Sequence, residues 1–117
     1  MDVNSTETLL KLMSVAALRG RVLANNIANQ NTPGYRRQEV RFEQDLLQEM
    51  ERMRPALDKI APRILADEAA VARTDGNTVS VEEEVSASRE NRVLFELYAA
   101  ILGGRMSILR SAINGAR

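Results

Sequence analysis

Small and apolar side chains near the start of the chain recur alternately four and three residues apart, at Leu9, Met13, Ala16, Gly20, Leu23 and Ile27. This spacing is typical of a coiled-coil seam. The sequence Thr32-Pro33-Gly34 cannot continue a helix, because proline disfavours helical geometry in the residue before it. The pattern therefore predicts a helix over residues 4–30, followed by a turn with Pro33-Gly34 as the central pair of type II geometry.

A second, longer helical pattern occupies the C-terminal third of the chain. Ser80 and Glu83 form a capping box, and Asn114-Gly115 is a typical helix end, which predicts a helix over 80–114. The run Glu82–Glu84 is interpreted as a helix start, because acidic side chains suit the positive end of the helix dipole. Two adjacent heptad lines of mostly apolar residues follow the helix, one through Phe95, Leu102, Met106, Leu109 and Ile113 and the other through Leu94, Tyr98, Ile101 and Ile108. We expect this helix to have more than one neighbour.

The middle of the chain is less regular. Residues 31–42 are predicted to form the turn and an extended segment, and apolar positions at helical spacing predict a short helix over 43–54. Pro55 and Pro62 interrupt regular structure, so 55–79 is predicted to be a loop or a small hairpin. Asp75-Gly76 is a hairpin-turn signal, and the alternation over 78–81 is typical of a strand.

The predicted fold is mainly α and forms a single domain of 117 residues. Its two long helices pack as an antiparallel coiled-coil layer. If their ends are aligned, Leu9 lies beside Ile113 and Gly20 lies level with Leu102 and Gly103. Glycines on both helices at one level permit close backbone approach, although Gly103-Gly104 is also compatible with a kink in an exposed helix.

The composition excludes several kinds of function. Sixteen basic residues balance sixteen acidic ones, which argues against a nucleic-acid or membrane-surface binder. The chain has neither cysteine nor histidine, so no thiol nucleophile, imidazole base or nitrogen- or sulfur-ligated metal is available. No apolar run is long enough to insert into a lipid bilayer, and the first residues do not resemble a cleaved signal peptide. We expect no enzyme, no catalytic residue, no cofactor and no metal. The local basic cluster of Arg36, Arg37 and Arg41 is interpreted as a solvated or intersubunit ion-pair face.

Three asparagines at the end of the first helix are unusual. Asn25 and Asn29 share one helix face, with Asn26 beside them, and asparagine is a poor residue in a helix interior. Two interpretations remain open from the residues alone. The amides either end the helix and hold the turn, or form hydrogen bonds to another subunit.

The stretch from Leu23 to Asn29, with Thr32-Pro33-Gly34-Tyr35 after it, resembles the N-terminal signature of bacterial flagellar rod, hook and hook-associated proteins. Asp75-Gly76-Asn77, Glu84, Asn91 and the segment 105–115 are similar to the B subtype of proximal-rod proteins. The C subtype is the alternative, but Asn91 occupies the place where that subtype usually has tyrosine. A soluble helical-hairpin adaptor is a further alternative.

The resemblance implies a structural subunit that is exported through the flagellar type III apparatus without a cleaved signal. Such subunits assemble helically with copies of themselves and other rod proteins into a hollow periplasmic drive shaft that transmits torque and passes exported subunits. Further partners implied are the rod–ring adaptor protein and the membrane-ring protein. The expected subunit interface consists of Leu9, Met13, Ala16, Gly20, Leu23, Asn25, Asn26, Ile27, Asn29, Thr32, Pro33, Gly34, Tyr35, Phe95, Leu102, Met106, Leu109 and Ile113.

Overall fold

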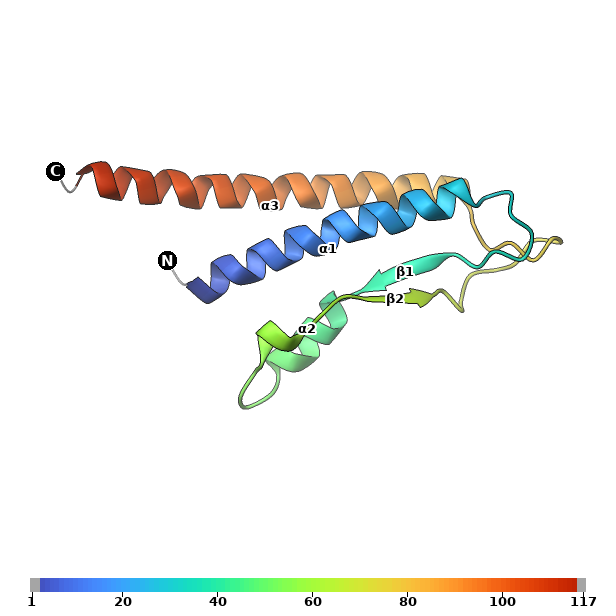
Figure 1. Ribbon diagram of the computed structural model, residues 1–117, viewed down its shortest axis with the longest axis horizontal. Coiled ribbons are helices and arrows are strands. Elements are labelled where there is room, and N and C mark those ends of the chain that lie inside the picture. Colours follow the sequence, from blue (N-terminus) through green and yellow to red (C-terminus); the bar gives the residue numbers. More distant parts are fainter. Residues whose placement is uncertain (1–2, 116–117) are drawn as a thin grey trace.

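Two long helices dominate the computed structural model, which describes residues 3–115. Helix α1 (Val3–Ala28) and helix α3 (Val81–Gly115) run antiparallel along the longest dimension of the molecule (Figure 1). The expected mainly helical fold with long terminal helices is confirmed. The molecule is elongated, since its radius of gyration is 18.3 Å, whereas a compact chain of this length has about 13 Å.

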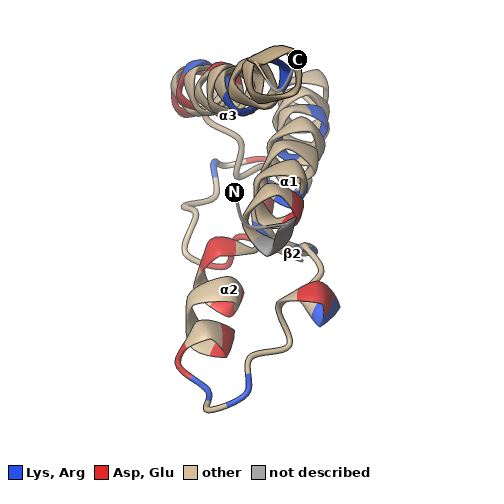
Figure 2. Ribbon diagram, turned by 90° about the vertical axis from the view of Figure 1, so that its left-hand side faces the viewer, with Lys and Arg blue, Asp and Glu red and all other residues tan. Residues whose placement is uncertain are grey.

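A small module lies between the two helices in sequence and to one side of them in space (Figures 1 and 2). It contains strand β1 (Gln38–Arg41), helix α2 (Glu43–Met50), a 3-10 turn (Leu57–Lys59) and strand β2 (Arg63–Ala66). The strands pair antiparallel, with Gln38 opposite Ala66 and Arg41 opposite Arg63. Helix α2 ends before the predicted residue 54, because residues 51–54 turn toward Pro55.

A loop and a small hairpin were both open for the region before α3, and residues 78–81 form no strand despite their alternation. Thr78 hydrogen-bonds through its backbone N–H to Tyr35, and α3 starts at Val81. Gly76 has φ +83°, as a turn residue, but the turn joins two irregular segments and not two strands. The strand that pairs with β1 is instead β2. Local turn signals could not indicate this pairing, because α2 and a 3-10 turn lie between the two strands.

The main apolar core lies between α1 and the module. Val15 and Val22 of α1 contact Val40 and Phe42, and the side chain of Phe42 is completely buried. Arg19 of α1 adds a bidentate ion pair, because its two terminal nitrogens lie 2.8 and 2.7 Å from the two carboxylate oxygens of Glu43 at the start of α2. Helix α1 is thus covered on two sides, whereas the predicted seam accounted for one.

The register between α1 and α3 differs from the predicted alignment of their ends. Arg105 donates hydrogen bonds to the hydroxyls of Ser5 and Thr6, and a β-carbon added to Gly20 would lie 3.5 Å from the side chain of Asn91. Aligned ends would have placed Gly20 beside Gly103. The helices are therefore offset from that alignment by roughly eleven residues, or three helical turns.

Two consequences follow from this offset. Of the two interpretations of Gly103-Gly104, close packing against α1 is wrong, since a β-carbon at either position would meet nothing within 4 Å. The end of α3 also extends past the start of α1, and every residue from Met106 to Gly115 is exposed (Figure 1).

Candidate functional site

The turn after α1 has the predicted geometry. Gly34 has φ +71°, the left-handed conformation that the third residue of a type II turn requires, and the N–H of Tyr35 donates to the carbonyl of Thr32 at 3.2 Å. The prediction for Pro33-Gly34 is confirmed. Thr32, Pro33 and Gly34 of this turn are exposed, and Tyr35 is half-buried.

A second turn, at residues 73–77, packs on this first turn. The N–H of Gly34 donates to the carbonyl of Asp75 at 2.9 Å. The fully buried amide of Asn77 donates to the carbonyls of both Asn29 and Thr32, at 2.9 and 2.8 Å. Asn77 therefore ties the loop that precedes α3 to the loop that follows α1, so that the end of α1 and the start of α3 lie close together.

Asparagines near the end of α1 form hydrogen bonds within the chain that hold this region together. Asn26 is completely buried; its amide nitrogen donates to the carbonyl of Gln38 at 2.8 Å and to the carboxylate of Glu84 at 3.1 Å. Its oxygen accepts from the N–H of Gln38 and the hydroxyl of Tyr35. The exposed Asn25 donates to the same hydroxyl at 3.1 Å. Asn26 is thus an internal residue whose amide is not available to a neighbouring subunit in this conformation.

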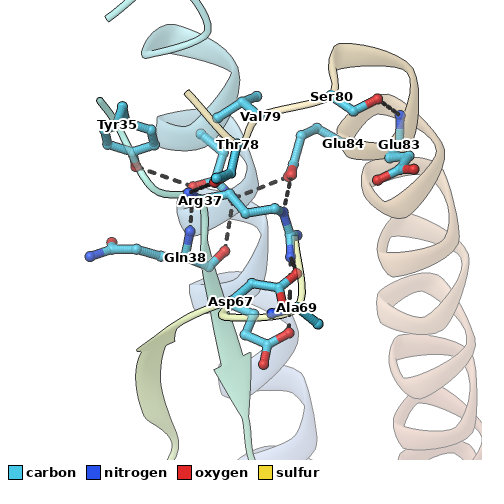
Figure 3. A network of polar contacts seen from close by, with 12 residues as sticks. Tyr35, Arg37, Gln38, Asp67, Ala69, Thr78, Val79, Ser80, Glu83 and Glu84 are labelled. Carbon is cyan, nitrogen blue, oxygen red and sulfur yellow. Dashed lines mark hydrogen bonds and ion pairs between the residues drawn. The ribbon is translucent and has the colours of Figure 1, made fainter. Parts of the chain in front are cut away.

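Arg37 forms an ionic centre with Glu84 and Asp67 (Figure 3). The side chain of Arg37 is 15% exposed. Its guanidinium donates to the buried carboxylate of Glu84 and lies 2.6 Å from the carboxylate of Asp67. Its backbone N–H donates to the hydroxyl of Thr78 at 2.8 Å. Arg37 directly precedes β1, so one arginine connects the segment before β1, the segment after β2 and the first turn of α3. We call Asn26, Arg37, Asp67 and Glu84 the polar junction.

The electrostatics of the polar junction favour its charged form. The hydrogen bond to Glu84 raises the pKa of Arg37 above its ordinary value, burial acts in the opposite direction, and Asp67 adds to the increase. The hydrogen bond from Arg37 lowers the pKa of Asp67. Opposite charges stabilise each other here because each loses part of its water shell on burial. The arrangement is suited to holding segments together.

The other notable feature is apolar surface along α3. Nine of its large apolar side chains are exposed, from 38% at Phe95 to 65% at Ile108. Five of them, Val93, Leu94, Leu97, Ile101 and Ile108, fall within one sector of about 100° when positions are placed 100° apart around the helix axis. We call these five residues the outer apolar face. It lies to one side of the line by which α3 contacts α1.

The residues predicted for the interface fall into three groups. Four are buried within the chain: Leu9, Ala16, Leu23 and Asn26. Six are partly buried: Met13, Gly20, Ile27, Asn29, Tyr35 and Leu102. Eight are exposed: Asn25, Thr32, Pro33, Gly34, Phe95, Met106, Leu109 and Ile113. The structure gathers Asn25, Asn26, Asn29, Thr32 and Tyr35 into one hydrogen-bonded group, whereas Leu9 and Ile113 are not brought together.

Sequence reasoning missed the polar junction. Arg37 was expected on a solvated or intersubunit face, and it is mostly enclosed by two carboxylates of its own chain. The helix start at Ser80 was predicted in the right place, but Glu84 in that first turn is 1% exposed, whereas Glu82 and Glu83 are exposed. The sequence did contain one sign that Glu84 is buried. Glu84 and Asn91 are seven residues apart, so they lie on one line along α3 and can face the same neighbouring helix.

The described residues offer little for catalysis or ligand binding. They include no group of three histidine, cysteine, aspartate or glutamate residues that could hold a metal ion. Among them there is also no helix of the length and apolarity needed to cross a lipid bilayer. The surface that remains to be explained is the exposed side of α3 and of the turn.

Comparisons with known proteins agree with this description. A family model described as flagella basal body rod protein matches residues 13–36, which include the end of α1 and the turn. The chain is 27% identical to flagellar basal body rod protein FlgB of Escherichia coli (strain K12), over 85% of this chain and 88% of that protein. It is 24% identical to FlgB of Bacillus subtilis (strain 168), over 95% and 94%, and 26% identical to FlgB of Borrelia hermsii, over 83% and 86%.

These findings support, first, a class of protein: a structural component of the flagellar basal-body rod. The relatives are rod proteins and not enzymes. Within that class the matches support the FlgB type, because relatives from several bacteria carry that name and align with this chain along most of its length. A location in the flagellar basal body, in association with its other components, follows from the same matches.

Proposed function

We propose that the chain is a structural subunit of the proximal rod that assembles helically with copies of itself and with other rod proteins into a hollow shaft. The shaft transmits torque and passes exported subunits. The observation that carries this proposal is the outer apolar face of α3. Its members are 40–65% exposed in the single chain, although they are residue types that normally form a core.

The energetics favour a neighbour on this face. Burying one large aliphatic side chain contributes about 1.5–3 kcal/mol relative to leaving it exposed. The face holds five such residues, and the four other large apolar residues exposed on α3, Phe95, Met106, Leu109 and Ile113, add to the surface available. Packing of α3 against helices of adjacent subunits would remove this surface from water, as stacking does in repeat assemblies.

The finer assignments rest on similarity to proteins named as basal body rod proteins. They comprise a position in the periplasmic part of the rod, contacts with the rod–ring adaptor protein and the membrane-ring protein, and passage through the type III export apparatus. The exposed members of the predicted interface, Asn25, Thr32, Pro33, Gly34, Phe95, Met106, Leu109 and Ile113, remain candidates for contact with neighbouring subunits.

The test is complementation of a bacterium that lacks the gene for this chain. Ile108→Asp places a charge on the outer apolar face at a position that is 65% exposed, so it leaves the fold of the single chain intact. Leu23→Asp would not serve, because Leu23 is buried inside the chain and its loss would unfold the protein. Ser107→Asp is the matched control, since Ser107 is an exposed neighbour on the polar side of α3.

We expect the parent chain and Ser107→Asp to restore swimming, and Ile108→Asp to be produced at the same level without restoring it. Basal bodies from the Ile108→Asp strain should stop before the hook forms. A motile deletion strain, or full motility with Ile108→Asp, would contradict the proposal.

A further inference from the structure

The residues by which α3 contacts α1 are polar at regular intervals. Glu84, Asn91 and Arg105 lie on one heptad line of α3, with the half-buried Tyr98 between the last two. Glu84 accepts from Asn26, Asn91 donates to the carbonyl of Ala16 at 2.8 Å, and Arg105 donates to Ser5 at 2.7 Å. Each contact reaches a different turn of α1. We call Glu84, Asn91 and Arg105 the polar line.

The apolar residues of α3 would favour a different alignment. If α3 slid by roughly eleven residues, or three turns, the side presented to α1 would rotate by only about 20°. Phe95, Leu102, Met106, Leu109 and Ile113 would then occupy the contact line, opposite the predicted apolar seam of α1. Such a slide would bury apolar side chains that are now exposed, so hydrophobic burial does not select the observed register.

Asn91 is also in an energetically unfavourable position. It is 7% exposed, and its side-chain oxygen has no hydrogen-bond donor among the residues that the structure describes. A buried asparagine in a helix seam characteristically sets register at the expense of stability. Here a slide of roughly eleven residues would break the bond from Asn91 to the carbonyl of Ala16 and carry Asn91 beyond the end of α1. Gly20 lies directly opposite Asn91 and supplies the room for its amide.

We propose that the polar line is a register lock: Glu84, Asn91 and Arg105 hold α3 three turns away from the alignment that would best match its apolar residues to α1. The lock keeps the C-terminal turns of α3 unpaired with α1 as far as residues 3–115 show, and Met106, Leu109 and Ile113 remain exposed. The inference concerns pairing inside one chain, and it stands or falls independently of the proposed rod function.

The test measures the register directly by spin labelling. The chain has no cysteine, so nitroxides can be placed on Ala24→Cys and Ser107→Cys, two exposed positions on α1 and α3. Double electron–electron resonance then reports the distance between them, with excess unlabelled chain added to suppress signals between molecules. A slide of three turns shortens this distance by about 16 Å.

The variant Glu84→Ala/Asn91→Ala removes two members of the polar line without adding apolar surface that would favour the observed register. A milder variant, Glu84→Gln/Asn91→Ala, keeps a polar side chain beside Arg37 in case the first variant fails to fold. The matched control is Glu83→Ala/Glu90→Ala, which introduces two alanines at neighbouring exposed positions outside the seam.

We expect the parent and the control to give one long distance. At least one seam variant should give a second, shorter distance in more than about a tenth of the molecules while it keeps the helical circular dichroism of the parent. A single long distance in both seam variants would overturn the proposal, and so would loss of helical structure in both, because the polar line would then stabilise the fold without selecting its register.

Discussion

Asn26 allows the sharpest test of how the turn region is held together. Its amide makes four hydrogen bonds inside the chain, to Gln38 twice, to Glu84 and to Tyr35, with donor–acceptor distances between 2.8 and 3.1 Å. Replacement by alanine removes all four and leaves the backbone N–H and carbonyl of Gln38 without this partner. At about 0.5–1.5 kcal/mol for each bond, and with allowance for relaxation, Asn26→Ala should destabilise the fold by about 2–4 kcal/mol.

Asn25→Ala is the matched control. Asn25 is a neighbouring asparagine on the same helix but is exposed, and its amide donates only to Tyr35 among the bonds that hold the turn. Alanine has a higher helix propensity than asparagine, and this gain of roughly 0.5 kcal/mol is the same at both positions, so it cancels in the comparison. We expect Asn25→Ala to change the free energy of unfolding by less than about 0.5 kcal/mol.

The measurement is urea unfolding followed by far-ultraviolet circular dichroism, at protein concentrations low enough to keep the chain monomeric. The slope of free energy against urea should stay the same, since both variants expose the same surface on unfolding. Equal destabilisation by the two variants, or a loss of under about 1 kcal/mol for Asn26→Ala, would refute the assignment of Asn26 as the internal link between α1, β1 and α3.

The remaining predictions concern charge and glycine. Arg37 lowers the pKa of Asp67 in the folded chain, so the stability from this pair is present above the unfolded value of about 3.9 and is lost as pH falls through the lower folded value. The stability difference between the parent and Asp67→Asn in urea unfolding should accordingly be largest near neutral pH and disappear in acid. Gly34→Ala should lower the free energy of unfolding by about 1–2 kcal/mol, because φ is +71° at this position, although a β-carbon would meet nothing within 4 Å. If thermal unfolding showed the variant to be as stable as the parent, the assigned turn geometry would be contradicted. Gly104→Ala, in an exposed helix interior with open space around it, should instead raise stability by about 0.5–1 kcal/mol, and a decrease would show that this glycine is in a packed contact.

Local features of the fold were predictable because neighbouring residues decide them. Proline at position 33 and glycine at position 34 suffice for a type II turn wherever the chain goes next. Ser80 with acidic residues after it suffices to start α3, which begins at Val81. The exposed apolar side chains of α3 were also anticipated in part, since two apolar lines exceed what one partner helix covers.

The site was less predictable because its contacts join residues far apart in the chain. Asn26 and Glu84 are separated by 58 positions, and Asn29 and Asn77 by 48. A charged residue gives no local sign of whether it faces water or a partner of its own chain, which is why Arg37 was assigned to a solvated or intersubunit face. The pairing of β1 with β2 had the same difficulty, since α2 and a 3-10 turn intervene between them.

The sequence by itself determined the helices, the turn between them and the surplus of apolar side chains on α3, because propensity and periodicity act over a few residues. The tertiary structure alone decided how α3 is placed along α1. An apolar pattern repeats with each turn, so a slide by whole turns changes it little. Specific polar contacts distinguish one register from another: those of Glu84, Asn91 and Arg105 with α1, and those of Asn77 with the turn after α1. The same tertiary contacts buried Asn26 and left the end of α3 without a packing partner among the residues that the structure describes.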